Sequence, residues 1–118
     1  MNRFYRKCIM LLLASLGGLT LANSAAQSQE VKGRTYVVTM TNMSFGGLPA
    51  EAQVGDIIIW NNNDSVQHSA TDRDGRFDYR LQPGQKARTI LREAGTFRID
   101  CIYHPTMRGS MQVVARGS

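Results

Sequence analysis

The chain has 118 residues, which is enough for one domain and too short for two of ordinary size. Its formal net charge is +5, yet no cluster of lysine and arginine residues is interleaved with aromatic ones. We therefore set aside nucleic acid as a partner.

The N-terminal segment has the three-part order of a secretory signal peptide. A basic start with Arg3, Arg6 and Lys7 precedes an almost wholly apolar run at residues 9–22. Small residues then follow at residues 23–26, as at a cleavage site. The apolar run is shorter than the roughly 20 residues that a membrane-spanning helix needs.

These features predict that residues 1–26 are a signal peptide, cleaved after Ala26, with a retained N-terminal anchor as the alternative. Cleavage removes three of the 14 basic residues and no acidic ones, so the net charge of residues 27–118 falls to +2. It also removes Cys8 and leaves Cys101 as the one thiol of an exported domain. In an oxidising compartment such a thiol is expected to be buried, reactive or bound. We expect a periplasmic protein with no stable membrane insertion after cleavage.

Short β-type segments separated by turn residues make up the rest of the chain. Strands are predicted at residues 35–41, 54–60, 66–71, 86–92, 96–101 and 111–115, with a loop or irregular edge at 43–51 and an irregular turn at 77–81. Asn61 and the three polar residues after it are expected to break the second strand. No window shows a helical period of useful length. Seven or so strands at this spacing predict an all-β sandwich or barrel.

Strand alternation predicts which residues form the core. The candidates are Val38, Met40, Val54, Ile58, Trp60, Leu91, Phe97, Ile99 and Val113. The unbroken run Ile57-Ile58-Ile59 leaves two alternatives, a central strand covered on both faces or an exposed apolar patch.

Four residues carry the chemistry. His68 and His104 are the only histidines; His104 follows Cys101 by three residues, and Met107 follows His104 by three. A tight loop can turn its three side chains toward one point, and His68 from another strand can close the site. Two imidazoles, a thiolate and a weak axial thioether are the ligands of blue-copper electron-transfer sites. Met111 competes with Met107 but is better interpreted as core.

The segment Cys101-Ile-Tyr-His104-Pro-Thr-Met107-Arg-Gly109 resembles the copper loop of the cupredoxins, and its short form is most like that of the amicyanins. Residues 55–64 and 97–101 resemble the strands that precede the ligands in that family. The resemblance implies a Greek-key β-sandwich of about 7–8 strands and one type 1 copper ion. It also implies that His68, Cys101 and His104 are the strong ligands and Met107 the axial one.

Three positions depart from the family pattern. Ser69 replaces the usual asparagine, although its backbone N–H can still reach the Cys101 sulfur. Ile102 lacks the hydroxyl often found after the cysteine, so it is not expected to complete a polar brace. Tyr103 replaces the common proline, and its backbone N–H is expected to donate a second hydrogen bond to the sulfur.

The function predicted is an exported blue-copper electron carrier without catalytic activity. The alternatives are a periplasmic copper-binding protein for storage, delivery or tolerance, and a structural β-domain without metal. Zinc is disfavoured because no acidic residue stands in the ligand loop as a general base. The resemblance implies a monomer that docks redox partners near His104, such as a donor dehydrogenase, a cytochrome or a terminal reductase or oxidase. Pro105, Thr106, Met107, Leu48 and Pro49 are the expected docking surface, and Arg73, Arg76 and Arg108 are expected to steer an acidic partner.

Overall fold

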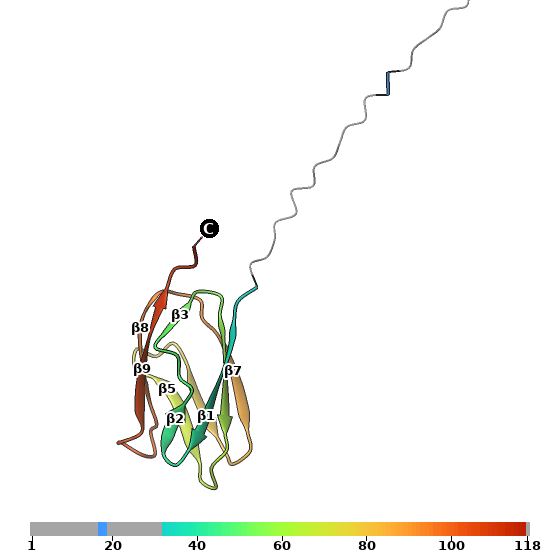
Figure 1. The fold of residues 1–118 in the computed structure, drawn as a ribbon. Coiled ribbons are helices and arrows are strands. Elements are labelled where there is room, and N and C mark those ends of the chain that lie inside the picture. The colour runs from blue at the N-terminus through green and yellow to red at the C-terminus, as the bar shows by residue number, and fades with distance from the viewer. Residues whose placement is uncertain (1–16, 19–31, 118) are drawn as a thin grey trace, which may run out of the picture.

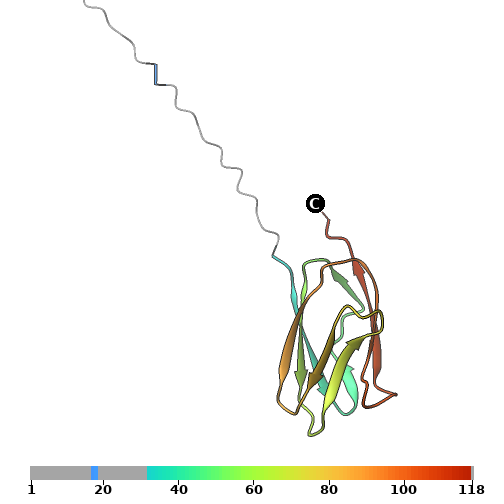
Figure 2. The same cartoon turned by 180° about the vertical axis from the view of Figure 1, so that it is seen from behind.

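Two β-sheets pack face to face in the described part of the chain (Figures 1 and 2). The computed structural model describes residues 17–18 and 32–117, and within them it contains nine strands and no helix. The strands are β1 (Thr35–Thr41), β2 (Ser44–Gly46), β3 (Glu51–Gln53), β4 (Ile57–Asn62), β5 (His68–Asp72), β6 (Asp78–Leu81), β7 (Lys86–Ile90), β8 (Gly95–Asp100) and β9 (Arg108–Val114). The predicted all-β sandwich is confirmed.

Strands distant in sequence lie side by side in both sheets. One sheet has the order β2-β1-β4-β7 and the other β3-β9-β8-β5-β6. β1 pairs with β4, and β3 with β9, in parallel; the other pairs are antiparallel. The crossovers between sheets agree with the predicted Greek-key class, and the described residues form nine strands where about 7–8 were expected. They bring the β1–β2 turn, the β4–β5 connection and the β8–β9 loop to the end of the sandwich opposite the C-terminal segment (Figure 1).

The N-terminal predictions fall mostly outside the described residues. Of the predicted signal peptide at residues 1–26, only Gly17 and Gly18 are described. No helix among the described residues is long and apolar enough to cross a membrane.

The bounds of β1 agree with the strand predicted at residues 35–41, but both ends of β4 differ from the strand predicted at residues 54–60. In β1, Val38 and Met40 point into the core and are fully buried. β4 begins at Ile57 rather than three residues earlier, because Gly55 has a φ of 93° and the N–H of Asp56 closes a turn onto Gln53. Only glycine adopts such a backbone conformation without strain.

β4 also continues through two asparagines that were expected to end it. Asn62 is fully buried, and its side-chain amide donates to the carbonyls of Val66 and Leu81 at 2.9 Å each. The asparagine stays in the strand because these carbonyls satisfy its buried amide. β4 is central, but Ile57 and Ile59 are half-buried on its outer face, so the strand is only partly covered there.

The core lies between the two sheets and is centred on Trp60. Phe45 meets its ring edge-on at a centroid distance of 6.1 Å, and Phe77 lies at 5.6 Å. The indole N–H donates to the hydroxyl of Thr89 at 2.8 Å, so the buried ring has its polar group satisfied. All predicted core residues are buried except Val54, which is half-buried against the core.

Candidate metal centre

Three strand ends position the predicted ligands. His68 is the first residue of β5, and Cys101 directly follows β8. His104 lies within the β8–β9 loop, and Met107 directly precedes β9. Two backbone hydrogen bonds close this loop: Cys101 N–H donates to the Met107 carbonyl at 3.0 Å, and Met107 N–H to the His104 carbonyl at 2.9 Å. The loop therefore returns on itself and holds three of the predicted ligands together.

The side chains of His68, Cys101 and His104 converge on one point. The two Nδ1 atoms lie 3.3 Å apart, and the Cys101 sulfur lies 3.8 Å from Nδ1 of His68 and 3.6 Å from Nδ1 of His104. His68 and Cys101 are buried, whereas His104 is half-buried and lies nearer the surface. Two imidazole nitrogens and one sulfur fit a soft or borderline metal ion such as copper. The structure thus brings together the predicted strong-ligand side chains.

Met107 is buried, but burial alone does not distinguish it from Met111. Both methionines are 1% exposed. Met111 pairs with Phe97 inside the β8–β9 ladder, as its assignment to the core requires. Met107 lies instead in the loop that carries Cys101 and His104, so the axial role of Met107 remains a prediction.

The surroundings of the sulfur confirm one expected contact and correct two others. The backbone N–H of Ser69 donates to the Cys101 sulfur at 3.3 Å, as predicted. The backbone N–H of Ile102 donates to the Ser69 hydroxyl at 2.8 Å, so a polar brace exists although Ile102 has an apolar side chain. Among the described residues, no hydrogen bond joins the Tyr103 N–H to the sulfur, and that expectation was wrong. The backbone N–H that contacts the sulfur comes from Ser69 in β5 rather than from the loop.

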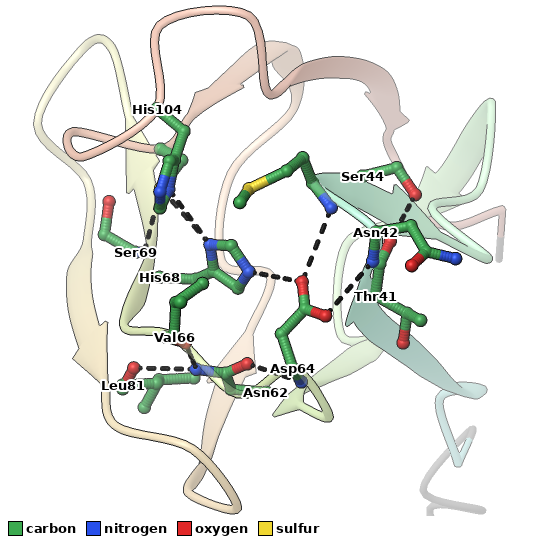
Figure 3. A network of polar contacts seen from close by, with 12 residues as sticks. Thr41, Asn42, Ser44, Asn62, Asp64, Val66, His68, Ser69, Leu81 and His104 are labelled. Carbon is green, nitrogen blue, oxygen red and sulfur yellow. Dashed lines mark hydrogen bonds and ion pairs between the residues drawn. The ribbon is translucent and has the colours of Figure 1, made fainter.

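Asp64 contacts one of the predicted ligands, His68, and was not predicted from the sequence as part of the site. One carboxylate oxygen lies 2.7 Å from Nε2 of His68, on the side of the ring that faces away from Cys101 and His104 (Figure 3). Hydrogen bonds from His68 and from the backbone N–H groups of Met43 and Asn42 lower the pKa of the Asp64 carboxyl. The group is therefore charged at neutral pH. The only sequence signal was an aspartate at the end of a polar turn, four residues before a histidine.

The expected docking residues require two corrections. Pro105 and Thr106 are exposed, and Leu48 and Pro49 are half-buried, but Met107 is buried and cannot meet a partner. The loop instead exposes two apolar side chains that were not assigned to the surface, Ile102 (45% exposed) and Tyr103 (38%).

Of the three arginines expected to steer a partner, Arg76 has a structural role. It forms an ion pair of 2.7 Å with buried Asp72, and its guanidinium lies 3.5 Å from the centroid of the Phe97 ring. Arg73 also forms an ion pair, of 2.8 Å with Asp100, although its side chain is half exposed. Arg108 is exposed and donates to a loop carbonyl. Of these three arginines, Arg108 alone forms no ion pair with a described carboxylate.

The chain is similar to solved structures of copper proteins. A reduced amicyanin carrying a proline-to-phenylalanine substitution is 26% identical with a TM-score of 0.57, and the alignment covers 67% of this chain and 81% of that one. The Cu(I) form of an amicyanin carrying a methionine-to-alanine substitution is 27% identical with a TM-score of 0.56, over 71% and 86% of the two chains. A copper-containing nitrite reductase from Thermus scotoductus is 25% identical with a TM-score of 0.57, over 65% and 21%. No protein-family model and no curated protein matches the sequence.

The coverage of these matches agrees with the prediction that the chain is not an enzyme. The alignment spans most of each amicyanin but only about one-fifth of the nitrite reductase chain. The matched part of the chain therefore spans most of an amicyanin and a small part of the reductase. The sandwich topology, the copper-loop sequence and the convergence of His68, Cys101 and His104 agree with these matches, and the described residues have an amicyanin-like cupredoxin fold.

Proposed function

We propose that this protein is an exported blue-copper electron carrier with a single copper ion held by His68, Cys101, His104 and Met107. The observation that carries the proposal is the convergence of two Nδ1 atoms and one sulfur in a mostly buried site. A trigonal set of two imidazoles and one thiolate with a distant thioether is typical of copper electron-transfer centres. Such a copper ion accepts and releases one electron by alternating between Cu(I) and Cu(II).

Contacts within the protein support this function because they fix the ligand side chains before any metal binds. The Ser69 N–H holds the sulfur, Asp64 holds the His68 ring, and the closed loop holds His104 relative to Cys101. Little rearrangement is then needed when the charge of the site changes, which favours fast electron transfer over metal release. Preorganised polar groups of this kind require no reorientation at the moment of charge transfer.

Redox-partner proteins are proposed to dock on the loop around His104. The half-buried His104 is surrounded in sequence by exposed Tyr103, Pro105 and Thr106, and exposed Ile102 adds apolar area. An apolar face with a ligand histidine near the surface suits brief contact with a donor dehydrogenase, a cytochrome or a terminal reductase or oxidase. We further propose that the carrier works in the periplasm as a monomer, after removal of residues 1–26.

The optical spectrum of the copper-loaded, oxidised protein tests the proposal. We expect an intense blue absorption from charge transfer between the Cys101 thiolate and Cu(II), and the substitution Cys101→Ser should abolish it. A protein that binds copper without this colour would contradict the proposal.

A matched pair of methionine variants tests the axial ligand. Met107→Leu should change the ratio of the charge-transfer bands and raise the reduction potential, because the axial ligand tunes the potential of such sites. Met111→Leu should leave both unchanged, although Met111 is equally buried. The opposite result would assign the axial role to Met111.

A further inference from the structure

The turn between β1 and β2 has an unfavourable backbone conformation next to the metal centre. Asn42 and Met43 have φ angles of 51° and 59°, in the left-handed region. They are the two central residues of a tight hairpin in which Thr41 pairs with Ser44. Asparagine tolerates this region, but methionine has no side-chain group that favours it. Within the turn, the Ser44 hydroxyl donates to the Thr41 carbonyl at 2.8 Å, and further contacts come from outside the segment.

The Asp64 carboxylate supplies those contacts and also binds His68. One oxygen accepts from the Asn42 N–H at 3.3 Å, and the other from the Met43 N–H at 3.4 Å. The second oxygen is the one that lies 2.7 Å from Nε2 of His68. Figure 3 shows Asp64 between His68 and the turn. The carboxylate is 18% exposed and the His68 side chain is fully buried, so water competes little for their hydrogen bond.

The position of Asp64 is itself fixed by buried Asn62. The Asp64 N–H donates to the Asn62 side-chain oxygen at 3.0 Å, while the amide nitrogen of Asn62 donates to two carbonyls. Every polar atom of the Asn62 side chain thus has a partner within the fold. The carboxylate projects from a segment that the core holds in place.

The chemistry of the carboxylate determines which nitrogen of His68 can bind a metal. A charged carboxylate only accepts hydrogen bonds, so Nε2 of His68 must carry the hydrogen of this contact. In the neutral ring, Nδ1 then keeps its lone pair, and Nδ1 is the atom that faces Cys101 and His104.

We propose that Asp64 is a positioning residue that couples the Asn42–Met43 turn to His68, so that one carboxylate supports both the left-handed turn and the orientation of the ligand Nδ1. The proposal rests on the proposed copper function. It implies that weakening the hydrogen bonds of the carboxylate lowers copper retention and destabilises the turn at the same time.

The test compares Asp64→Asn with Asp74→Asn, which removes the same charge from a side chain that is 74% exposed. In Asp64→Asn we expect copper loss to a chelator to become about tenfold faster or more, as is typical when the partner of a ligand histidine is removed. In the copper-free variant, amide hydrogen exchange should accelerate at Asn42 and Met43, and the His68 nitrogen signals in NMR should show a mixture of tautomers. Asp74→Asn should change none of these.

Two results would overturn the proposal. Unchanged copper loss and unchanged His68 signals, with faster exchange in the turn, would make Asp64 a turn residue only. Unchanged exchange at Asn42 and Met43 would show that the turn is independent of the carboxylate. If Asp64→Asn does not fold, Asp64→Glu tests the same readouts with the charge kept and the geometry altered. The measurements on the copper-free protein test the role of Asp64 independently of the proposed function. A wild-type protein that is not blue with copper would contradict the proposed function and leave these measurements valid.

Discussion

The two ends of the sandwich each contain an aspartate that accepts hydrogen bonds from two backbone N–H groups and one basic side chain. At the end of the C-terminal segment, Asp56 accepts from Arg34 N–H and Gln53 N–H at 2.8 Å each and pairs with the Arg116 guanidinium. At the metal end, the corresponding backbone contacts of Asp64 are 3.3 and 3.4 Å, and its short contact goes to His68.

These contacts indicate different roles for the two aspartates, one in the stability of the fold and the other in positioning a ligand. Asp56 is 2% exposed, and its partner Arg116 is always charged, so this cluster ties the start of β1, the β3–β4 turn and the C-terminal segment together. Asp64 is more exposed, and its partner has a second nitrogen that faces the predicted ligands. We infer that Asp56 contributes mainly to the stability of the fold and Asp64 mainly to the site.

The largest effect on stability is expected from Asp56→Ala. It leaves two partly buried backbone N–H groups and the Arg116 guanidinium without their acceptor, and we expect the free energy of unfolding to fall by about 3 kcal/mol. Chemical denaturation measures this loss, and Glu51→Ala, at an exposed residue near the same cluster, should cost no more than about 0.5 kcal/mol. The blue absorption of folded Asp56→Ala should equal that of the wild type; a changed spectrum would show that the two ends are not independent.

The acid stability of the protein sharpens the role of Asp56. Burial raises the pKa of its carboxyl, but the hydrogen bonds from two backbone N–H groups and Arg116 outweigh burial and hold the pKa below its ordinary value of 3.8. The folded state then binds fewer protons than the unfolded state, so this contribution is complete above pH 3.8 and is lost as the pH falls through the folded-state pKa. The difference in unfolding free energy between wild type and Asp56→Asn should therefore shrink only below about pH 4. A difference that stays constant with pH would contradict this role.

An intermediate effect is expected from Ser69→Ala at the metal end. It removes the acceptor of the Ile102 N–H but keeps the Ser69 N–H that binds the Cys101 sulfur. We expect a loss of about 1–2 kcal/mol in stability and faster copper release, because the loop loses its link to β5. The control is Thr71→Val, which removes the 2.9 Å contact between the two hydroxyls and the 2.8 Å hydrogen bond to Asp78 but leaves the Ile102 hydrogen bond intact. Equal copper release from both variants would count against the brace.

The smallest effect is expected from Gly109→Ala. A Cβ atom at this residue of β9 would lie 2.5 Å from the end of the Leu48 side chain, which is flexible and half-buried. Leu48 can move aside, so we expect a loss of about 1 kcal/mol or less. In a Leu48→Ala background the same substitution should cost almost nothing, and an equal cost in both backgrounds would contradict the contact.

Regular strands were predictable from the sequence because alternation repeats over enough residues to be detected. β1 has seven residues and was predicted with its observed bounds, whereas β2 and β3 have three residues each and were not predicted as strands. A three-residue edge strand shows no period, and only its pairing with β1 or β9 defines it. The burial of Phe45 within β2 escaped notice for the same reason.

The candidate ligands were predictable because their residue types are rare in this chain, and their supporting contacts were not. His68, Cys101 and His104 stand out by chemistry and spacing. The brace between Ser69 and Ile102 joins a side chain to a backbone group 33 residues away. Such contacts depend on how β5 meets the β8–β9 loop, which residue types do not specify.

Voltammetry of the copper-loaded protein in the presence of a Cu(I) chelator tests the central claim most directly. An electron carrier should give a reversible one-electron couple whose size stays constant over repeated cycles, because the buried site retains copper in both oxidation states. A couple that fades as the chelator takes up Cu(I) would contradict the carrier function and indicate copper delivery or storage.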